Sequence, residues 1–443
     1  MVRLLWCAAV VGILVLTPVG SSSASALTAS GESFAPTLRT PLVAELPSTG
    51  SPRLPVIVID FPDQPSTLST RAIDSVVFGV GDARRAPFES LRSFYLRSSY
   101  GKLDLRGDVL GVYRATQPRA ELTGSDVQTR LVSEALQAFD EAGADFSRYD
   151  ADEDGRIDYL IVLWTGPAKR GGVWWGSYTG GGSAVVVDGT RLGAYSWQGV
   201  PMDGSARTLV HETGHALGLS DLYDANPAVG PGGGVGAFDP MGDGSCDLNA
   251  LSKIMLGWIV PRVVSAGVAD LVLRPTSDAP DAAIVMPSFS MAAPYGEFYV
   301  VQARRRSGND AAWPYETTSG LQVWHVDATL ATTGRYRYNN SSSAHRFLSV
   351  VQADGLREIE TLDMSNSADL FHTGGEFSER SAAGNELHSG ATSGVTLNNV
   401  RCGADSVRVS AGALPPKAVR TRNARAARAR TVAAARRLAA VRR

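Results

Sequence analysis

The chain has 443 residues, of which 44% are hydrophobic and 19% charged, and its formal net charge is −2. This length and composition exclude a disordered protein and predict two or three packed domains. The small net charge conceals an uneven distribution, because the segment from Pro415 to Arg443 holds ten Lys and Arg and no acidic residue, which leaves 32 basic and 44 acidic residues elsewhere.

The chain opens with a pattern typical of an export signal. Arg3 precedes an almost continuously apolar run over residues 4–17, and an Ala-Ser-Ala cleavage pattern ends at Ala26. We therefore expect residues 1–26 to be a signal peptide. An apolar run of about 14 residues is short for a spanning helix, and no later run is long enough to span. The sequence predicts a secreted, extracellular protein with no transmembrane segment in its mature form.

The next segment, residues 27–52, is rich in Ser, Thr, Pro and Ala and shows no periodicity, which is typical of a short pro-segment or linker. A catalytic domain is predicted over residues 53–261. It begins with the apolar, β-rich run 54–61, which we expect to form a buried strand. The elements predicted to follow are two helices and a strand, within residues 86–100, 126–143 and 157–164.

Residues 150–158 read DADEDGRID and place acidic side chains at alternate positions before a glycine, as in an EF-hand calcium loop. The pattern departs from a full EF-hand at its twelfth position, where Ile161 replaces a bidentate glutamate, and a strand follows. We expect a truncated calcium loop, with a plain acidic turn as the alternative. The expected ligands are the carboxylates of Asp150, Asp152, Asp154 and Asp158 and the backbone carbonyl of Arg156.

Residues 211–221 read HETGHALGLSD and carry the strongest functional signal in the chain. His211 and His215 are four residues apart, so on an α-helix both imidazoles project from one face and can reach one metal ion. Glu212 is placed to act as general base toward a metal-activated water, the arrangement in which H-E-x-x-H serves peptide hydrolysis. The alternative is a surface helix with two ordinary histidines.

The residues after this helix predict a third ligand. Gly218 can end the helix in a left-handed turn, which brings Asp221 back toward the metal. Three protein ligands and one open position are typical of catalytic zinc, whereas structural zinc has four ligands, usually including Cys. Asp224, or a carboxylate outside the motif, is the alternative third ligand. Tyr223 is the candidate donor to the oxyanion formed during hydrolysis.

Met241 follows a proline in a glycine-rich stretch and is expected to form a tight turn beneath the histidines, with simple packing as the alternative. An apolar helix over residues 249–258 should close the domain. Residues 262–412 then change to short alternating runs, which predict a β-rich C-terminal region. Two cysteines remain in the mature chain, Cys246 and Cys402, and either a disulfide or two separate thiols fits the pattern.

The last segment, residues 413–443, alternates Arg with Ala and has too little bulk to bury, so a disordered tail is predicted. Its charge could attract an anionic surface such as a cell-wall polymer, nucleic acid or lipid head groups. A solvated tail without a partner is the alternative. Nothing in the sequence predicts an oligomeric state.

In their order and spacing these segments resemble the immune inhibitor A type of secreted metallopeptidases, peptidase family M6. The resemblance rests on six runs: LPVIVIDFPD (54–63), FYLRSSYGKLDLRG (94–107), DGRIDYLIV (154–162), HETGHALGLSDLYD (211–224), FDPMGDGSCDLNALSKIMLGW (238–258) and SGLQVWHVD (319–327). It implies an α+β protein with a zincin-like catalytic domain, built of a mixed sheet and an active-site helix. Secretion, bound zinc and calcium, and cleavage of protein substrates are implied as well.

Carried onto this sequence, the resemblance assigns zinc to His211, His215 and Asp221, and the catalytic base to Glu212. The chain departs from the family pattern at Gln302, where an acid is expected. His325 and Asp327 end a predicted strand, and a structural strand end is preferred there over a second metal or polar site.

The function predicted from these residues is a secreted zinc-dependent endopeptidase. A rival of another class is a catalytically silent exported protein that binds zinc and calcium and recognises a surface. Glu212 argues against this rival, because a purely structural zinc site needs no base. A zinc hydrolase of non-peptide amides is a second rival.

Overall fold

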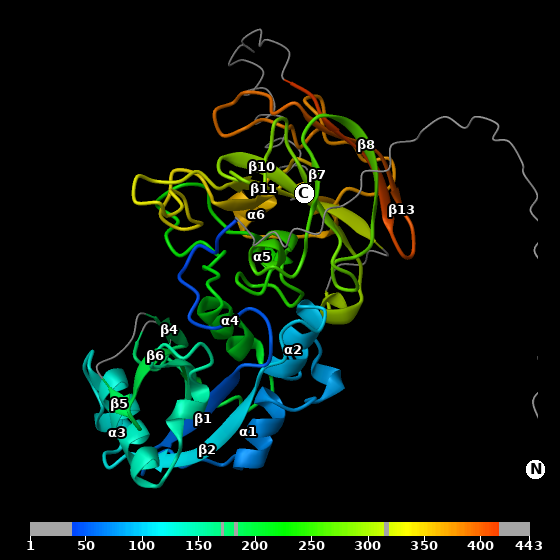
Figure 1. The fold of residues 1–443 in the computed structure, drawn as a ribbon. Coiled ribbons are helices and arrows are strands. Elements are labelled where there is room, and N and C mark those ends of the chain that lie inside the picture. Colours follow the sequence, from blue (N-terminus) through cyan, green and yellow to red (C-terminus); the bar gives the residue numbers. More distant parts are fainter. Residues whose placement is uncertain (1–37, 170–171, 181–184, 314–318, 416–443) are drawn as a thin grey trace, which may run out of the picture. The chain divides into compact units, whose positions relative to one another are not determined.

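The computed structural model describes residues 38–169, 172–180, 185–313 and 319–415. The expected signal peptide, the start of the expected pro-segment and nearly all of the basic tail lie outside the described residues. The described residues belong to one compact unit that begins at Pro36. Few helices and several sheets give a mixed α and β architecture (Figure 1), consistent with the expected α+β class.

The first sheet is mixed. Its strands β2, β1, β3 and β6 are adjacent in this order and run parallel, while β4 and β5 pair with β6 in the antiparallel direction. The bounds are β1 Arg53–Asp60, β2 Arg106–Arg114, β3 Arg156–Trp164, β4 Ser177–Thr179, β5 Val186–Val187 and β6 Thr190–Gly199. The expected strands at 54–61 and 157–164 are confirmed as β1 and β3. Both read as continuous apolar runs because parallel strands are buried on both faces.

Two cores flank this sheet. One contains Val56 and Val58 of β1 and packs beneath α1, α2 and α4, while the other contains Ile57 and Ile59 and packs beneath α3. The helices concerned are α1 Thr70–Val77, α2 Leu91–Ser98, α3 Val127–Glu141 and α4 Arg207–Ala216. The expected helices within 86–100 and 126–143 are confirmed as α2 and α3. Helix α4 packs against β6 and the edge strand β4 (Figure 1).

After α5 (Ala250–Met255), the chain is rich in strands, as expected for residues 262–412. A five-stranded sheet has the order β12-β11-β10-β9-β7, and a three-stranded sheet has the order β13-β14-β8. The bounds are β7 Arg262–Val264, β8 Gly267–Leu273, β9 Ala282–Val285, β10 Glu297–Arg304, β11 Gly320–Asp327, β12 Leu348–Val350, β13 Val395–Cys402 and β14 Val407–Ala413. One short helix, α6, spans Glu358–Leu362.

The five-stranded sheet takes part in two cores. Phe298, Val300 and Trp324 belong to the same core as Val56 and Met241, whereas the alternate residues of β10 and β11 pack toward the three-stranded sheet. The core beneath α4 therefore contains residues from both the segment 53–261 and the segment 262–412, which the sequence assigns to separate regions. No helix in the described part of the chain combines the length and apolarity needed to span a bilayer.

Candidate metal centre

Helix α4 presents two imidazoles from one face, as the four-residue spacing predicts. The rings of His211 and His215 lie 4.9 Å apart between centroids. His215 is buried and His211 half-buried, so the helix holds the pair at the margin of the core. A buried face also explains why this short helix forms, since tertiary packing supplies most of the stability of short helices.

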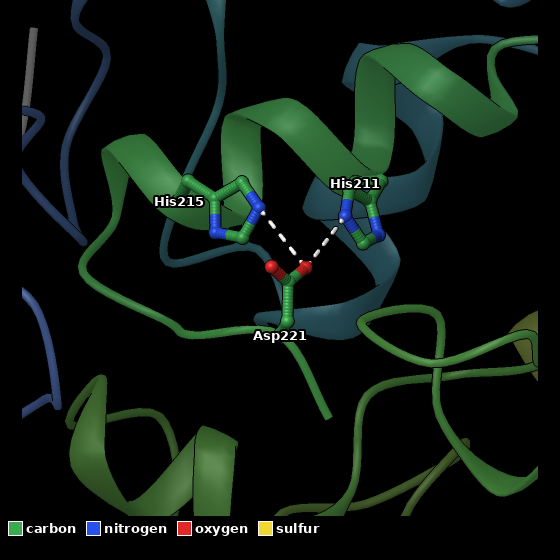
Figure 2. A group of neighbouring side chains, drawn as sticks. All are labelled: His211, His215 and Asp221. Carbon is green, nitrogen blue, oxygen red and sulfur yellow. Dashed lines mark hydrogen bonds and ion pairs between the residues drawn. The ribbon is translucent and has the colours of Figure 1, made fainter. Parts of the chain in front are cut away.

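Gly218 ends the helix in the left-handed conformation, at a φ of +92°, which confirms the predicted turn. Its N–H donates to the His215 carbonyl, and the chain then reverses beneath the helix to Asp221 (Figure 2). Oδ1 of Asp221 lies 3.1 Å from Nε2 of His211 and 3.4 Å from Nε2 of His215. The structure therefore brings these three potential ligand atoms together at one point.

The other nitrogen of each ring faces a backbone carbonyl. Nδ1 of His211 lies 3.0 Å from the Pro240 oxygen, and Nδ1 of His215 lies 2.8 Å from the Leu219 oxygen. A carbonyl oxygen can only accept, so each neutral imidazole carries its proton on Nδ1 and has a free lone pair on Nε2. Such outer contacts fix the tautomer and orientation of metal-binding histidines. Sequence reasoning did not identify these carbonyls.

The turn that supplies the Pro240 carbonyl continues into Met241, which is fully buried. A Cβ built on Gly214, in the middle of α4, would lie only 2.3 Å from the Met241 sulfur. The thioether therefore packs directly against the helix backbone between the two histidines. This contact requires glycine at position 214, a requirement that the sequence alone did not reveal.

Glu212 lies next to His211 and is only 5% exposed. Burial raises the pKa of the Glu212 carboxyl, and the adjacent histidines oppose the rise. A Cβ added to Gly176 would come within 3.1 Å of Oε1 of Glu212. The segment that leads into β4 thus passes close to this carboxylate.

The charges of the cluster are coupled. Burial acts to raise the pKa of Asp221, but His211 and His215, when they are also protonated on Nε2, donate to its carboxylate and hold that pKa well below its usual range. For His211, burial acts to lower the pKa, and the contact with Asp221 reverses the sign and raises it. The two imidazoles therefore stabilise the negative charge of the Asp221 carboxylate.

Two tyrosines border the cluster. The ring of Tyr223 stacks on His211 at 6.1 Å between centroids, and burial together with Asp221 raises the pKa of its phenol to about 12. Tyr178, on the edge strand β4, lies 5.6 Å from the His215 ring. Its hydroxyl is buried and has no hydrogen-bond partner among the described residues. An unpaired buried hydroxyl is costly, and sequence reasoning had not assigned Tyr178 a role.

Two other expectations concern residues near this core. Asp224 is not among the three clustered ligand groups, and its Oδ1 accepts instead from the Asn226 N–H. Gln302 is fully buried, where Oε1 accepts from the Ala250 N–H at 2.7 Å and from the Trp324 indole at 2.8 Å. The amide therefore fastens the start of α5 to the five-stranded sheet.

The acidic loop before β3 brings together three of its four expected carboxylates. Asp150, Asp152 and Asp158 place oxygens within 4.8 Å of one another. Asp154 stands apart from this group and faces Arg156, with Oδ2 3.8 Å from Nε. Burial and the neighbouring carboxylates raise the pKa of Asp158 to about 7.

The cysteines are two separate thiols. Cys246 is buried in the core beneath α4, and Cys402 lies half-buried against the core of the β-rich region. Of the two alternatives left by the sequence, the structure has the unpaired one.

Comparison with known proteins gives partial matches at low identity. The chain is 26% identical over 198 residues to "Immune inhibitor A" of Bacillus thuringiensis subsp. alesti, a match that covers 35% of this chain and 28% of that protein. It is 29% identical over 196 residues to "Pre-pro-metalloprotease PrtV" of Vibrio cholerae serotype O1 (strain M66-2), covering 36% of this chain and 21% of that protein.

The same identity and coverage are found for PrtV of a second strain, ATCC 39315 / El Tor Inaba N16961. No family model matches the chain. The matches span less than a third of the length of these curated relatives. They indicate a distant relationship to metallopeptidases.

Proposed function

We propose that the chain is an exported zinc-dependent endopeptidase that hydrolyses peptide bonds of protein substrates. The observation that carries the proposal is the convergence of Nε2 of His211, Nε2 of His215 and Oδ1 of Asp221, with the buried Glu212 beside them. The distant relationship to metallopeptidases points to the same chemistry.

The donor set suits zinc. Two imidazole nitrogens and one carboxylate oxygen are ligands that zinc accepts, and three protein ligands leave a position open for a reactant. Both imidazoles already expose a lone pair on Nε2, because their Nδ1 atoms donate to the carbonyls of Pro240 and Leu219. A bound zinc ion supplies the positive charge that polarises a carbonyl and acidifies a water.

Glu212 is the proposed general base. A buried carboxylate accepts the proton of the attacking water, and burial makes it a better acceptor than an exposed glutamate. The protonated Glu212 then donates to the leaving amine. The oxyanion needs a donor, for which Tyr223 is the candidate from sequence. Tyr178 is a second candidate, because its ring lies near that of His215 and its buried hydroxyl has no hydrogen-bond partner among the described residues.

The edge strand β4 offers a place for an extended substrate. Among the strands that the structure describes it pairs only with β6, and it carries Tyr178 next to His215. A peptide that adds to its other side by main-chain hydrogen bonds would run past the proposed zinc ligands. This mode of binding favours polypeptides over small amides.

Calcium binding at the acidic loop is part of the proposal. Asp150, Asp152 and Asp158 would supply the carboxylate oxygens, with Asp154 and the Arg156 carbonyl completing the set if the loop closes. Export by residues 1–26, a catalytic domain over 53–261 and a β-rich region over 262–412 belong to the same proposal.

The test is casein hydrolysis with zinc determined on the same purified sample, before and after chelation and zinc return. Activity should disappear with the metal and reappear with it. A sample that holds zinc, whose metal centre is open to substrate, and that cleaves neither casein nor small amides would support the catalytically silent binding protein. Cleavage of small amides alone would support the zinc hydrolase of non-peptide amides.

Glu212→Gln tests the proposed base. We expect it to retain zinc and lose activity by about 100-fold or more, because it removes the proton acceptor and leaves the ligands in place. Glu141→Gln, an exposed glutamate at the end of α3, should behave as wild type. Undiminished proteolysis by a zinc-loaded Glu212→Gln protein would remove Glu212 from this role.

A further inference from the structure

A second cluster of histidines and carboxylates lies in the five-stranded sheet. Glu297 and Asp327 face each other across β10 and β11, and Tyr299 faces His325 two residues further along. Residues in register, and residues two apart on a strand, project from the same face. Because Tyr299 belongs to the core that packs toward the three-stranded sheet, this face is opposite to the one that packs beneath α4.

Three imidazoles stack at this place. The ring of His388 lies between those of His325, at 4.6 Å and 16°, and His345, at 3.9 Å and 14°. The three come from separate segments: strand β11, the loop before β12, and the loop before β13. Half of the six histidines of the chain therefore gather at one point far from the His211 motif in sequence.

A carboxylate holds each outer imidazole. Nε2 of His325 lies 2.9 Å from Oε2 of Glu297, and Nε2 of His345 lies 2.6 Å from Oδ2 of Asp327. Glu297 also accepts from the backbone N–H of His388 at 2.7 Å. The His388 imidazole itself makes no hydrogen bond to any residue that the structure describes, so both of its nitrogens are available to a ligand.

Two triads of ligand atoms share His388. Glu297, His325 and His388 place one donor atom each within 4.8 Å of one another, and so do Asp327, His345 and His388. We propose that this cluster is a second metal site, which binds one zinc-type divalent transition-metal ion with His388 as the common ligand. The site is independent of the His211 centre and of the proposed peptidase activity.

The donor chemistry selects the class of ion. Imidazole nitrogens favour zinc and its transition-metal neighbours, whereas calcium and magnesium are bound by oxygen alone. Ligand atoms of a tetrahedral zinc site lie roughly 3.3 Å apart, as follows from bond lengths of about 2.0–2.1 Å. The ligand atoms of each triad, which lie within 4.8 Å of one another, would have to draw together to reach that geometry.

The arrangement favours a structural role. Each triad supplies three of the four ligands that close a structural zinc site. An ion bound by His388 would fasten its loop either to β10 and β11 through Glu297 and His325, or to the end of β11 and the loop before β12 through Asp327 and His345. Binding of this kind stabilises the folded state in proportion to the logarithm of the ion concentration.

The experiment measures zinc content of the full chain by mass spectrometry after equilibration at buffered free zinc. We expect His388→Ala to hold one zinc ion fewer than wild type, and a His211→Ala, His215→Ala protein to retain one. His372→Ala is the matched control, because His372 lies in the same β-rich region outside the cluster and should leave the count unchanged.

The thermal midpoint gives a second readout. Zinc should raise it in the His211→Ala, His215→Ala protein, and the increase should be lost when His388→Ala is added. Since His388 is exposed, its replacement should not prevent folding. His388→Ala with a wild-type zinc count, or a His211→Ala, His215→Ala protein that binds no zinc, would overturn the proposal. Neither outcome depends on whether the chain cleaves proteins.

Discussion

The histidines of α4 illustrate how a side chain becomes a ligand in two steps. Their spacing puts both rings on one face of the helix, a local property. The carbonyls of Pro240 and Leu219 then accept from Nδ1 of the two rings, and this leaves the lone pair of each Nε2 available to a metal ion. The Leu219 carbonyl is four residues from His215, but that of Pro240 arrives from a turn 29 residues beyond His211.

Gly214 is the residue on which the packing of this turn depends. We expect Gly214→Ala to lower the free energy of unfolding by about 1–3 kcal/mol, because the new methyl group would overlap the Met241 sulfur. Without that contact, Gly to Ala inside a helix stabilises by about 0.5–1 kcal/mol. Chemical denaturation of the purified variants measures the difference.

A double-mutant cycle separates the clash from other effects. In a Met241→Ala background the penalty of Gly214→Ala should vanish, since the sulfur is gone. Gly172→Ala serves as control, because a Cβ there meets no described residue closer than the Lys169 carbonyl oxygen at 3.8 Å. Equal penalties of Gly214→Ala in both backgrounds would show that Met241 is not the cause.

At the scale of elements, a buried ionic network joins α2, α5 and β10. Lys253 of α5 is fully buried and lies 2.6 Å from Oδ2 of Asp247. The other oxygen of Asp247 accepts from Ser98 of α2 at 2.6 Å. Arg304 of β10 pairs with Asp310 at 2.8 Å and donates to the Phe238 carbonyl. The helices around the proposed site are thereby tied to the β-rich region.

Breaking this network from one side should be costly. Asp247→Ala leaves the Lys253 ammonium buried without its carboxylate, and we expect a loss of about 3–5 kcal/mol in the free energy of unfolding. Replacing the pair together, as Asp247→Leu with Lys253→Met, should recover much of that loss. Denaturant titration gives both values.

A surface pair supplies the comparison. Asp82 and Arg84 lie 2.7 Å apart at the surface, and Oδ1 of Asp82 also accepts from the Arg84 backbone N–H. Asp82→Ala should lower the free energy of unfolding by much less than Asp247→Ala, because the exposed ion pair contributes little and the lost cap accounts for most of the effect. A loss for Asp247→Ala no larger than that for Asp82→Ala would contradict the importance of the buried network.

At the scale of the whole molecule, part of the expected pro-segment is built into the fold. The N–H groups of Glu45 and Leu46 donate to the Ala216 carbonyl at the end of α4, and that of Leu42 donates to Gly218. The side chains of Leu38 and Leu46 are buried in the core. Residues 38–50 therefore support the turn that carries Asp221.

This packing predicts where the mature chain starts. Removal of residues 38–52 would expose two core leucines and leave the carbonyls of Ala216 and Gly218 unpaired, so any processing that preserves the fold should cut before Leu38. N-terminal sequencing of the stable secreted protein should find a start at or before that residue. A stable, folded protein that starts after residue 52 would contradict the prediction.

A substitution in the intact chain tests the same contact. Leu46→Ala should lower the free energy of unfolding by about 2–5 kcal/mol, as expected for a buried leucine. Leu42→Ala, where the side chain is 38% exposed, should change it by about 0.5 kcal/mol at most. The difference should appear in chemical denaturation.

The sequence by itself determined the elements whose signals are local. Strands β1 and β3 follow from apolar runs, α2 and α3 from helical spacing, and the left-handed turn at Gly218 from the freedom of glycine at positive φ. The relation between the two histidines of α4 is of the same kind, because four residues make about one helical turn.

Only the tertiary structure decided what depends on distant segments meeting. The Pro240 carbonyl on His211, the Tyr178 ring near His215 and the packing of residues 38–50 all join parts of the chain that no local pattern relates. The stack of His325, His345 and His388 arises in the same way, since strand register and two loops place rings together that are widely separated in sequence. Contacts of this kind are fixed by the packing of the whole chain, so a sequence pattern over a few residues does not predict them.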